Sequence, residues 1–137
     1  MTRPPAAPDG PPLRHRLTGR TLAPAGLLAI LEKCWSVETS SKWTPDNPAR
    51  GQCSVTALVL MDVFGGRLLK TRVGGEWHFY NEINGAVRDF TASQFPRKIA
   101  YENKAASAAE ALADTSPEQV RVLSDRLGRA ILSSERT

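Results

Sequence analysis

Residues 51–64 read GQCSVTALVLMDVF, a cysteine followed at once by an almost uninterrupted apolar run. The run is long enough for a helix, is apolar on nearly every side and meets a C-terminal stop at Gly65-Gly66. A helix this apolar is expected at the centre of the fold. Its first turn offers unpaired backbone N–H groups and the positive end of the helix dipole, and both favour a thiolate at Cys53. The stretch therefore predicts a central buried helix, from about residue 52 to residue 64, with a nucleophilic cysteine at its N-terminus.

Upstream of this stretch, the sequence predicts one more helix and a polar loop. From Leu22 the pattern becomes helical, and Pro24 is tolerated in a first turn. The apolar positions recur at spacings of three and four, at Leu27, Leu28, Leu31, Cys34 and Trp35. Cys34 thus lies on the core face of an ordinary amphipathic helix, which indicates a structural role. Residues 36–50 carry Trp43 and two prolines and form the loop that leads to Gly51.

Downstream of the central helix, the pattern changes to short strands. Residues 67–73 and 76–83 suit two strands joined by Gly74-Gly75. Asn84-Gly85 is a strong signal for a two-residue hairpin turn, which leads into a third strand over residues 86–90. These segments predict a small antiparallel sheet.

The C-terminal third of the chain predicts two helices after an ambiguous segment, residues 93–101. Residues 104–113 form an alanine-rich helix, and Ser116-Pro117-Glu118-Gln119 is a capping box that opens the last helix. The apolar face of this last helix consists of Val120, Leu123, Leu127 and Ile131. We expect an α+β fold: N-terminal helices, including the buried helix headed by Cys53, packed on the small sheet, with C-terminal helices.

The hairpin turn fixes which side chains share a face of the sheet. A two-residue turn at Asn84-Gly85 places His78 and Asp89 on one face as diagonal neighbours, with Cβ atoms roughly 6 to 8 Å apart. That distance lets a carboxylate meet an imidazole. Tyr80 shares this face, and the opposite face carries Trp77, Phe79 and Asn81. A three-residue loop would separate His78 from Asp89, so the hairpin geometry tests their pairing.

Cys53, His78 and Asp89 supply the parts of a cysteine-nucleophile site. In such a site the imidazole takes or shares the thiol proton, and the carboxylate holds the ring tautomer and stabilises the imidazolium. The oxyanion of an attacked carbonyl needs two donors, of which the Cys53 backbone N–H is the first. Gln52, or a side chain from the 39–43 loop, is expected as the second. The candidate oxyanion or substrate-binding residues are Gln52, Thr39, Trp43, Trp77, Tyr80 and Asn81.

The composition is that of one ordinary domain, because 137 residues with 41% hydrophobic and 23% charged residues suffice for one core. Residues 1–20 hold five of the ten prolines, and four arginines against one aspartate give them +3 of the formal net charge of +4. They predict a disordered leader, and residues 21–137 predict a single domain. No basic face with interleaved aromatic residues continues into the domain, which disfavours nucleic acid as a partner.

The sequence also predicts a compartment and the state of its thiols. The N-terminus has no apolar export segment, and no stretch has the length and apolarity of a transmembrane span. We expect a cytoplasmic protein without a membrane partner, in which Cys34 and Cys53 are free thiols. A zinc site at Cys53, His78 and Asp89 is unattractive, because zinc sites normally use closely spaced Cys and His pairs. No metal and no organic cofactor are expected.

Each candidate residue also has a structural interpretation. Free cysteine is among the most buried residue types, so Cys53 could simply fill the core. Asp89 could equally cap the turn into Ser93-Gln94. The three tryptophans favour core and rim packing over a ligand cage, although Trp77 adjoins His78 and could line a cleft.

The block from residue 35 to residue 95 resembles the YunG family of small bacterial proteins. The matching residues are Trp35-Ser36, Glu38-Thr39-Ser40, Trp43, Gly51-Gln52-Cys53, Thr56-Ala57-Leu58-Val59, Gly65-Gly66, His78 with Asn81, Asp89-Phe90-Thr91 and Gln94-Phe95. The family in turn resembles a minimal papain-like or transglutaminase-like core, in which a cysteine tops a helix and His and Asp come from adjacent strands. The resemblance implies that Cys53 is the nucleophile, His78 the base and Asp89 the orienting group.

Three hypotheses of function follow, in this order. The first is a cysteine hydrolase or acyltransferase (amidase, peptidase or transglutaminase-like) that acts through a thioester on a peptide, a protein side-chain amide or a small amide. The second is a binding module on the same fold, with an idle triad and a cleft around Trp43, Trp77 and Tyr80 that holds a peptide or small molecule. The third is association with DNA or RNA through the arginines of the leader. The oligomeric state is left open.

Overall fold

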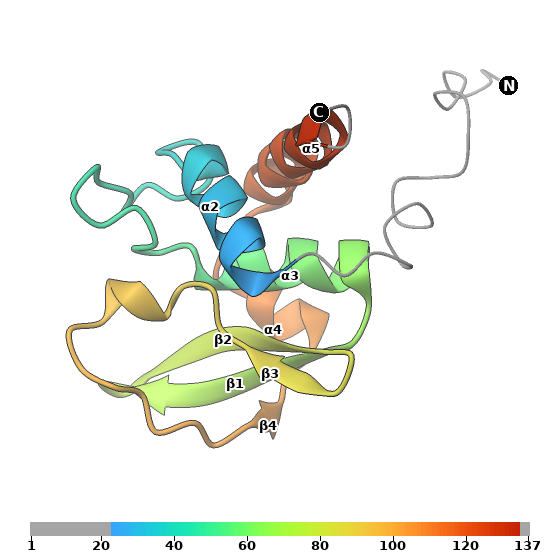
Figure 1. Cartoon of the computed structure of the whole chain (residues 1–137). Helices are drawn as coiled ribbons and strands as arrows, with labels where there is room; N and C mark the ends of the chain where they lie inside the picture. Colours follow the sequence, from blue (N-terminus) through green and yellow to red (C-terminus); the bar gives the residue numbers. More distant parts are fainter. Residues whose placement is uncertain (1–22, 135–137) are drawn as a thin grey trace, which may run out of the picture.

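The computed structural model describes residues 23–134, and Figure 1 shows how they are arranged. The predicted leader, residues 1–20, lies outside the described residues. Within them are four α-helices, a short 3-10 helix and one four-stranded antiparallel sheet, so the predicted α+β class is confirmed. The elements are, in chain order, α2 (Pro24–Cys34), α3 (Cys53–Phe64), β1 (Arg67–Val73), β2 (Glu76–Ile83), β3 (Ala86–Arg88), η1 (Ala92–Gln94), β4 (Lys104–Ala105), α4 (Ala108–Ala113) and α5 (Pro117–Ser134).

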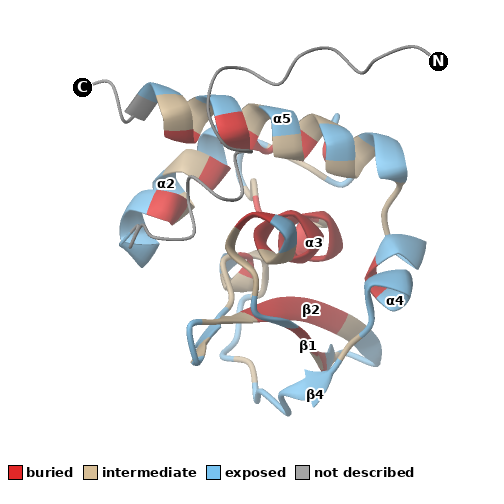
Figure 2. Cartoon of the chain, turned by 90° about the vertical axis from the view of Figure 1, so that its right-hand side faces the viewer, coloured by how far each residue is buried: buried red, intermediate tan, exposed pale blue. Residues whose placement is uncertain are grey.

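Helix α3 forms the middle layer of the fold, with α2 and α5 on one side of it and the sheet on the other (Figures 1 and 2). Nine of its twelve residues are buried, which fits a segment that is apolar on nearly every side. Thr56 accepts a hydrogen bond from the Trp35 indole N–H at 2.9 Å, and the Ala57 carbonyl accepts one from the Asn81 amide at 2.9 Å. The helix ends at Gly65, which has a φ of 79°. The predicted central buried helix is confirmed.

The outer helix layer buries the apolar stripes that the sequence predicts. Its buried side chains are Leu27, Leu31 and Cys34 of α2 and Leu123, Leu127 and Ile131 of α5, which pack with residues of α3. Helix α5 begins at Pro117 as expected, and Ser116 accepts a hydrogen bond from the Gln119 N–H at 3.1 Å. The Gln119 side chain accepts from the Thr115 hydroxyl at 2.8 Å. None of the helices in residues 23–134 is both long enough and apolar enough to cross a membrane.

The sheet has the strand order β3-β2-β1-β4, and the predicted hairpin register is confirmed. Asn84 and Gly85 form the two-residue turn with φ values of 52° and 77°. Ile83 therefore pairs with Ala86, the pairing on which the shared face of His78 and Asp89 depends. The face of the sheet toward α3 carries Asn81, and the opposite face carries Tyr80, as predicted.

Strand β3 is shorter than the sequence predicts, because it ends at Arg88 instead of residue 90. At Asp89 the chain turns away from β2 toward η1. The Asp89 Oδ1 accepts the Thr91 N–H at 3.1 Å, so a local side-chain bond replaces further pairing in the sheet. Beyond Arg88, β2 has no neighbouring strand on that side within the described sheet.

The helix predicted over residues 104–113 is wrong in its first part. Lys104 and Ala105 form β4, an edge strand paired with Lys70 and Leu69 of β1, and the helix begins only at Ala108. Ser107 sets that start through a capping box: its hydroxyl accepts the Glu110 N–H at 3.1 Å, and the Glu110 carboxylate accepts the Ser107 N–H at 2.7 Å. Backbone groups on the free edge of β1 therefore outweigh the helical preference of the residues before Ser107.

The segment between η1 and β4 covers the face of the sheet that points away from α3 (Figure 1). The Thr71 hydroxyl donates to the Ala100 carbonyl at 3.0 Å, and the Tyr80 hydroxyl donates to the Asn103 side chain at 2.8 Å. This cover buries Thr71 and Tyr80. It also leaves His78, on the same face, in a largely dry environment.

Candidate active site

Cys53 is the first residue of α3, as predicted, and is 9% exposed. No side chain caps this end of the helix, so its first-turn N–H groups are left to interact with a charged sulfur or a ligand. The preceding turn requires glycine, because Gly51 has a φ of 75° and a Cβ there would lie 2.8 Å from the Lys42 Cβ. The sequence Gly-Gln-Cys thus brings the loop tightly onto the head of the helix.

The structure brings His78 and Asp89 into direct contact. His78 Nε2 lies 2.7 Å from Asp89 Oδ2, and the two side chains are 1% and 5% exposed. The sheet ladder ends one residue before Asp89, at the pair Asn81–Arg88. Asp89 nevertheless reaches the imidazole, because the chain bends at this point across the open edge of β2.

The carboxylate of Asp89 accepts hydrogen bonds on both of its oxygens. Oδ1 accepts from the Thr91 N–H at 3.1 Å and the Thr91 hydroxyl at 3.3 Å, and Oδ2 accepts from the Tyr101 hydroxyl at 2.7 Å as well as facing His78. Burial and the bond to Asp89 raise the pKa of Tyr101, so the phenol remains a donor. Asp89 therefore caps a turn through Oδ1 and contacts the imidazole through Oδ2.

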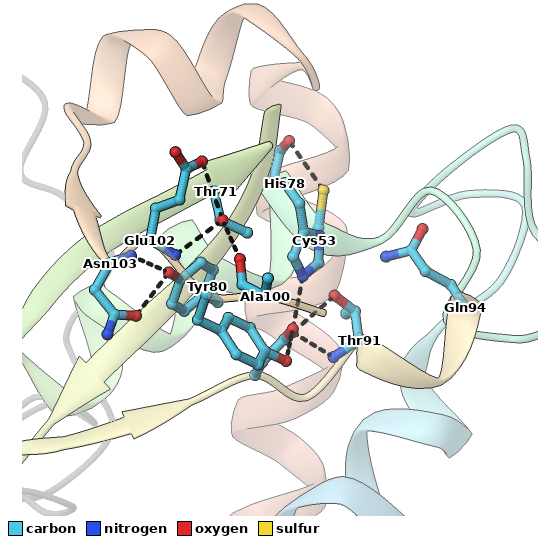
Figure 3. A network of polar contacts seen from close by, with 12 residues as sticks. Cys53, Thr71, His78, Tyr80, Thr91, Gln94, Ala100, Glu102 and Asn103 are labelled. Atoms are coloured by element: carbon cyan, nitrogen blue, oxygen red, sulfur yellow. Dashed lines mark hydrogen bonds and ion pairs between the residues drawn. The ribbon is translucent and has the colours of Figure 1, made fainter. Parts of the chain in front are cut away.

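The two nitrogens of His78 have different surroundings. Nε2 faces Asp89, and Nδ1 is buried without a hydrogen-bond partner among the described residues. Burial alone lowers the pKa of the imidazole, but the interactions with Asp89 and then with Cys53 outweigh it and raise the pKa to about 9. Because Asp89 occupies Nε2, Nδ1 is the nitrogen left for Cys53, whose sulfur lies beside the ring in Figure 3. The imidazole thus stands between a carboxylate and a thiol.

The short segment after Asp89 connects the two halves of the site. The Gln94 Oε1 accepts the Gly51 N–H at 3.2 Å, and the Gln94 carbonyl accepts from the Asn47 amide at 3.2 Å. The Phe95 ring meets the His78 ring edge-on, with centroids 5.0 Å apart. The helix η1 and its flanks therefore hold the loop before Cys53 and the imidazole in one arrangement.

Gln94 and Tyr101 belong to this site, and the sequence reasoning assigned a role to neither of them. Gln94-Phe95 is part of the family resemblance, which is the one signal in the sequence that points to the segment. No spacing rule could connect Gln94 to Gly51, because the two lie 43 positions apart in the chain. Tyr101 comes from a segment without a clear periodic pattern.

An open groove of about 920 Å³ passes Cys53 and His78. Its walls are the loop that precedes Cys53, the β1–β2 hairpin and the end of α4 with the start of α5. The loop contributes the cations Lys42 and Arg50, and the α4 side contributes the anions Glu110 and Asp114. The thiol and the imidazole therefore line a groove whose walls differ in charge.

Trp77 lines this groove, in keeping with the prediction that it adjoins a cleft. Three cations lie over its ring, with Lys70 Nζ at 4.5 Å, Arg72 Cζ at 4.3 Å and Lys104 Nζ at 5.6 Å from the centroid. Such contacts hold the indole and the cations together. Trp77 therefore forms a fixed wall of the groove.

Gln52 and Thr39 come together as a buried pair that is not among the residues lining the groove. The Thr39 hydroxyl donates to Gln52 Oε1 at 2.8 Å, and Gln52 Nε2 donates to the Ser36 carbonyl at 3.4 Å. Both residues are 0% exposed. Their contacts fix the loop from residue 36 onward against the start of α3.

The remaining predicted substrate-binding residues, Trp43, Tyr80 and Asn81, also lie outside the groove lining. Trp43 packs against the core of the helix layer. Tyr80 stacks on His78 at a centroid distance of 5.9 Å, and Asn81 ties β2 to α3. The structure thus places these three side chains behind the site or in the core.

Side chains that could ligate a metal do not cluster in the part of the chain that the structure describes. No group of three or more His, Cys, Asp or Glu side chains there is placed to hold a metal ion. Cys34 and Cys53 are both buried and are not joined in a disulfide.

Comparison with known proteins gives a family. The model of the family described as YunG protein matches residues 23–131, which extends the resemblance seen in the sequence to α2 and most of α5. A Bacillus subtilis (strain 168) protein named "Uncharacterized protein YunG" is 50% identical over 109 residues, which make up 79% of this chain and 95% of the relative. No solved structure gave a significant match.

Proposed function

This chain belongs to the YunG family, and we propose that it is a cysteine-dependent hydrolase or acyltransferase that acts on amides. Cys53 is the nucleophile, His78 the base and Asp89 the group that orients the imidazole. The substrate is a peptide, a protein side-chain amide or a small amide, and the acyl acceptor is water or an amine. The proposed steps use neither a metal nor an organic cofactor.

The arrangement of the two His78 nitrogens carries this proposal. Nε2 contacts the Asp89 carboxylate at 2.7 Å, and the unpartnered Nδ1 is left for the sulfur of Cys53. A purely structural buried histidine is expected to satisfy both nitrogens with fixed partners. An imidazole held by a carboxylate on one side and facing a thiol at a helix N-terminus on the other is suited to proton transfer.

The chemistry balances with these three side chains alone. With its proton on His78, the Cys53 sulfur bonds to the amide carbon, and the C=O electron pair moves onto the oxygen. Re-formation of the C=O bond breaks the C–N bond, the leaving amine takes the proton from His78, and a thioester remains. Water or an amine then gives a proton to His78 and attacks the thioester, which breaks the C–S bond and releases the Cys53 sulfur as a thiolate beside the imidazolium. Asp89 remains ionised and stabilises each imidazolium.

The electrostatics of His78 support the first of these steps. Its pKa of about 9 means that the ring carries a proton at neutral pH, beside the Cys53 sulfur. An imidazolium next to a sulfur at a helix N-terminus favours the thiolate. The groove then brings a carbonyl to the nucleophile, and its cationic and anionic walls suit the polar, charged surface of a peptide.

We further propose that the fold is a minimal papain-like or transglutaminase-like core in a cytoplasmic protein. The support is the placement of the three side chains: Cys53 at the head of the buried helix, His78 on β2 and Asp89 directly after β3. A reducing compartment would keep Cys53 in the thiol form that the chemistry needs.

The test uses p-nitrophenyl acetate, an activated acyl donor small enough for any groove. Wild-type protein should form an acetyl thioester at Cys53, seen by peptide mass spectrometry, with release of p-nitrophenolate. Cys53→Ala should form none, and Cys34→Ala should behave as wild type. Full turnover in Cys53→Ala would contradict the proposed enzyme activity, and so would a folded wild-type protein whose Cys53 is not acylated. Either result would favour the binding module instead.

A further inference from the structure

The side-chain amide of Gln94, in the wall of the groove, carries a buried donor that has no hydrogen-bond partner among the described residues. We propose that its Nε2 is the side-chain donor that binds the oxyanion of the tetrahedral intermediate, together with the Cys53 backbone N–H. This inference rests on the proposed acyl chemistry and assigns its second hydrogen-bond donor.

The orientation of this amide is fixed by a partner that can only donate. The Gly51 backbone N–H donates to Gln94 Oε1 at 3.2 Å, so the other end of the amide must be the NH₂ group. Figure 3 shows that this nitrogen points toward Cys53 and His78. The donor therefore faces the reacting groups, while the carbonyl end stays with the loop.

The Nε2 atom is buried, and it has no hydrogen-bond partner among the residues that the structure describes. An unsatisfied buried donor destabilises a fold, so a native structure that keeps one calls for an explanation. Gln94 nevertheless lines the groove beside Cys53, where a bound molecule could supply the acceptor. A donor without a partner at that place is explained if the oxygen of a substrate supplies the acceptor.

Gln94 is held in position before any substrate arrives. Its side chain is bound to Gly51, and its backbone carbonyl accepts from the Asn47 amide at 3.2 Å. Gly51 lies two residues before Cys53, so the same contact sets the distance between the amide and the head of α3. Donors fixed in advance around a developing charge are the effective ones in oxyanion stabilisation, because no reorganisation is needed during the reaction.

Gln52, the side chain that the sequence favours as the second donor, is engaged elsewhere. Its Nε2 donates to the Ser36 carbonyl at 3.4 Å, and the residue is 0% exposed. Gln94 offers the same chemical group from a different element, with its donor unpartnered. The geometry thus moves the side-chain oxyanion donor from the residue before the nucleophile to the helix η1.

The test compares two reactions of Cys53 that differ in their need for an oxyanion donor. Acylation by p-nitrophenyl acetate passes through a tetrahedral oxyanion, whereas alkylation by iodoacetamide displaces iodide at a saturated carbon and forms none. Dividing the acylation rate constant by the alkylation rate constant cancels any change in the reactivity of the sulfur that affects both reactions. Gln94→Met, which deletes the donor, should lower this ratio on the order of 100-fold.

Two further variants separate the donor from the fold. Gln94→Glu keeps an acceptor for the Gly51 N–H and replaces the NH₂ by an oxygen, so its ratio should fall at least as far as that of Gln94→Met. Glu118→Met changes an exposed residue of α5 that pairs with Arg121 and is not among the residues that line the groove, and its ratio should stay at the wild-type value. Urea unfolding of each variant verifies that it is folded.

The outcomes distinguish this inference from the proposed function. If wild-type Cys53 is acylated and the ratio falls in both Gln94 variants, the donor role is supported. An unchanged ratio in both variants overturns it and leaves the enzyme intact, and a fall in Gln94→Met alone overturns it too, because Gln94 then acts only through Gly51. A wild-type protein that is not acylated ends both proposals together.

Discussion

Cys34 and Cys53 are both buried at the end of a helix, yet their surroundings differ in nearly every respect that governs reactivity. Cys34 is the last residue of α2, at the negative end of the helix dipole, and is packed in the core of the helix layer. Cys53 is the first residue of α3, at the positive end, and lines the groove beside His78. Their exposed fractions, 4% and 9%, differ little.

The difference shows that burial alone does not decide what a cysteine does. Burial raises the pKa of the Cys34 thiol, and the positive charge of Arg126 only partly offsets it. No histidine accompanies Cys34 in its cluster. Cys53 has the His78 imidazole beside it and lies at a helix N-terminus that no side chain caps. The chain therefore contains its own control for every experiment on the nucleophile.

The largest expected effect is the gap in alkylation rate between the two cysteines. At pH 7, iodoacetamide should modify Cys53 at least about 100-fold faster than Cys34, since only Cys53 lies beside an imidazole at a helix N-terminus. In His78→Ala the gap should narrow sharply, because the imidazole that accepts the thiol proton is gone. Peptide mass spectrometry reads both sites in one sample.

Urea-denatured protein provides the control for this measurement, because both thiols should then react at about the same rate. Equal alkylation rates of Cys53 and Cys34 in the folded protein would contradict the difference between the two cysteines. A rate difference that persists in full in His78→Ala would show that His78 does not activate the Cys53 thiol.

The positions of the two cysteines and the shared face of His78 and Asp89 could be predicted from the sequence, because they depend on local sequence patterns. The apolar run after Cys53 specifies a buried helix, and Asn84-Gly85 specifies a turn that fixes the register of β2 and β3. From these two features follow the position of the thiol and the shared face of His78 and Asp89. Cys34 was likewise placed in the core by the spacing of its apolar neighbours.

What supports the site could not be predicted, because it depends on the path of a loop. The bond between Gln94 and Gly51 and the bond between Tyr101 and Asp89 both require the course of residues 89–103, which carry no periodic pattern. The strand β4 was missed for a related reason. Its two residues prefer helix, and only the free edge of β1, more than thirty positions away, makes them a strand.

The second expected effect is a pH dependence of the stability that His78, the residue beside Cys53, gives to the fold. The folded protein raises the pKa of His78 from 6.5 to about 9, so the protonated ring stabilises the fold. By linkage, this contribution is complete below pH 6.5 and is lost as the pH rises through about 9. The difference in free energy of unfolding between wild type and His78→Ala should thus shrink between pH 6 and pH 10, by an amount on the order of 3 kcal/mol.

Urea unfolding at the two pH values measures this difference. Cys34→Ala, in which the imidazole is intact, should show the wild-type dependence in this range. A stability difference for His78→Ala that is independent of pH would contradict the uptake of a proton from solvent at the imidazole, on which the predicted change in stability rests.

The smallest expected effect tests how far from Cys53 a side chain can lie and still affect the reactivity of its sulfur. Tyr101→Phe removes one of the donors to Asp89 but leaves the contact of Asp89 with His78 and both bonds from Thr91. A hydrogen bond to a charged group contributes about 1.5 to 3 kcal/mol, so at this partly exposed phenol stability should fall by roughly the lower figure or less.

The alkylation rate of Cys53 in Tyr101→Phe should change little, by less than about threefold, because the phenol competes with His78 for the same Asp89 oxygen and its removal does not weaken the imidazole–carboxylate contact. The matched variant is Tyr80→Phe, which deletes a hydroxyl on the same face that bonds Asn103 instead of Asp89. A loss of Cys53 reactivity in Tyr101→Phe as large as that in His78→Ala, without a similar loss in Tyr80→Phe, would make the phenol part of the reactive group. In that case the groups that control the reactivity of Cys53 would include Tyr101, in the segment that covers the sheet, as well as His78 and Asp89.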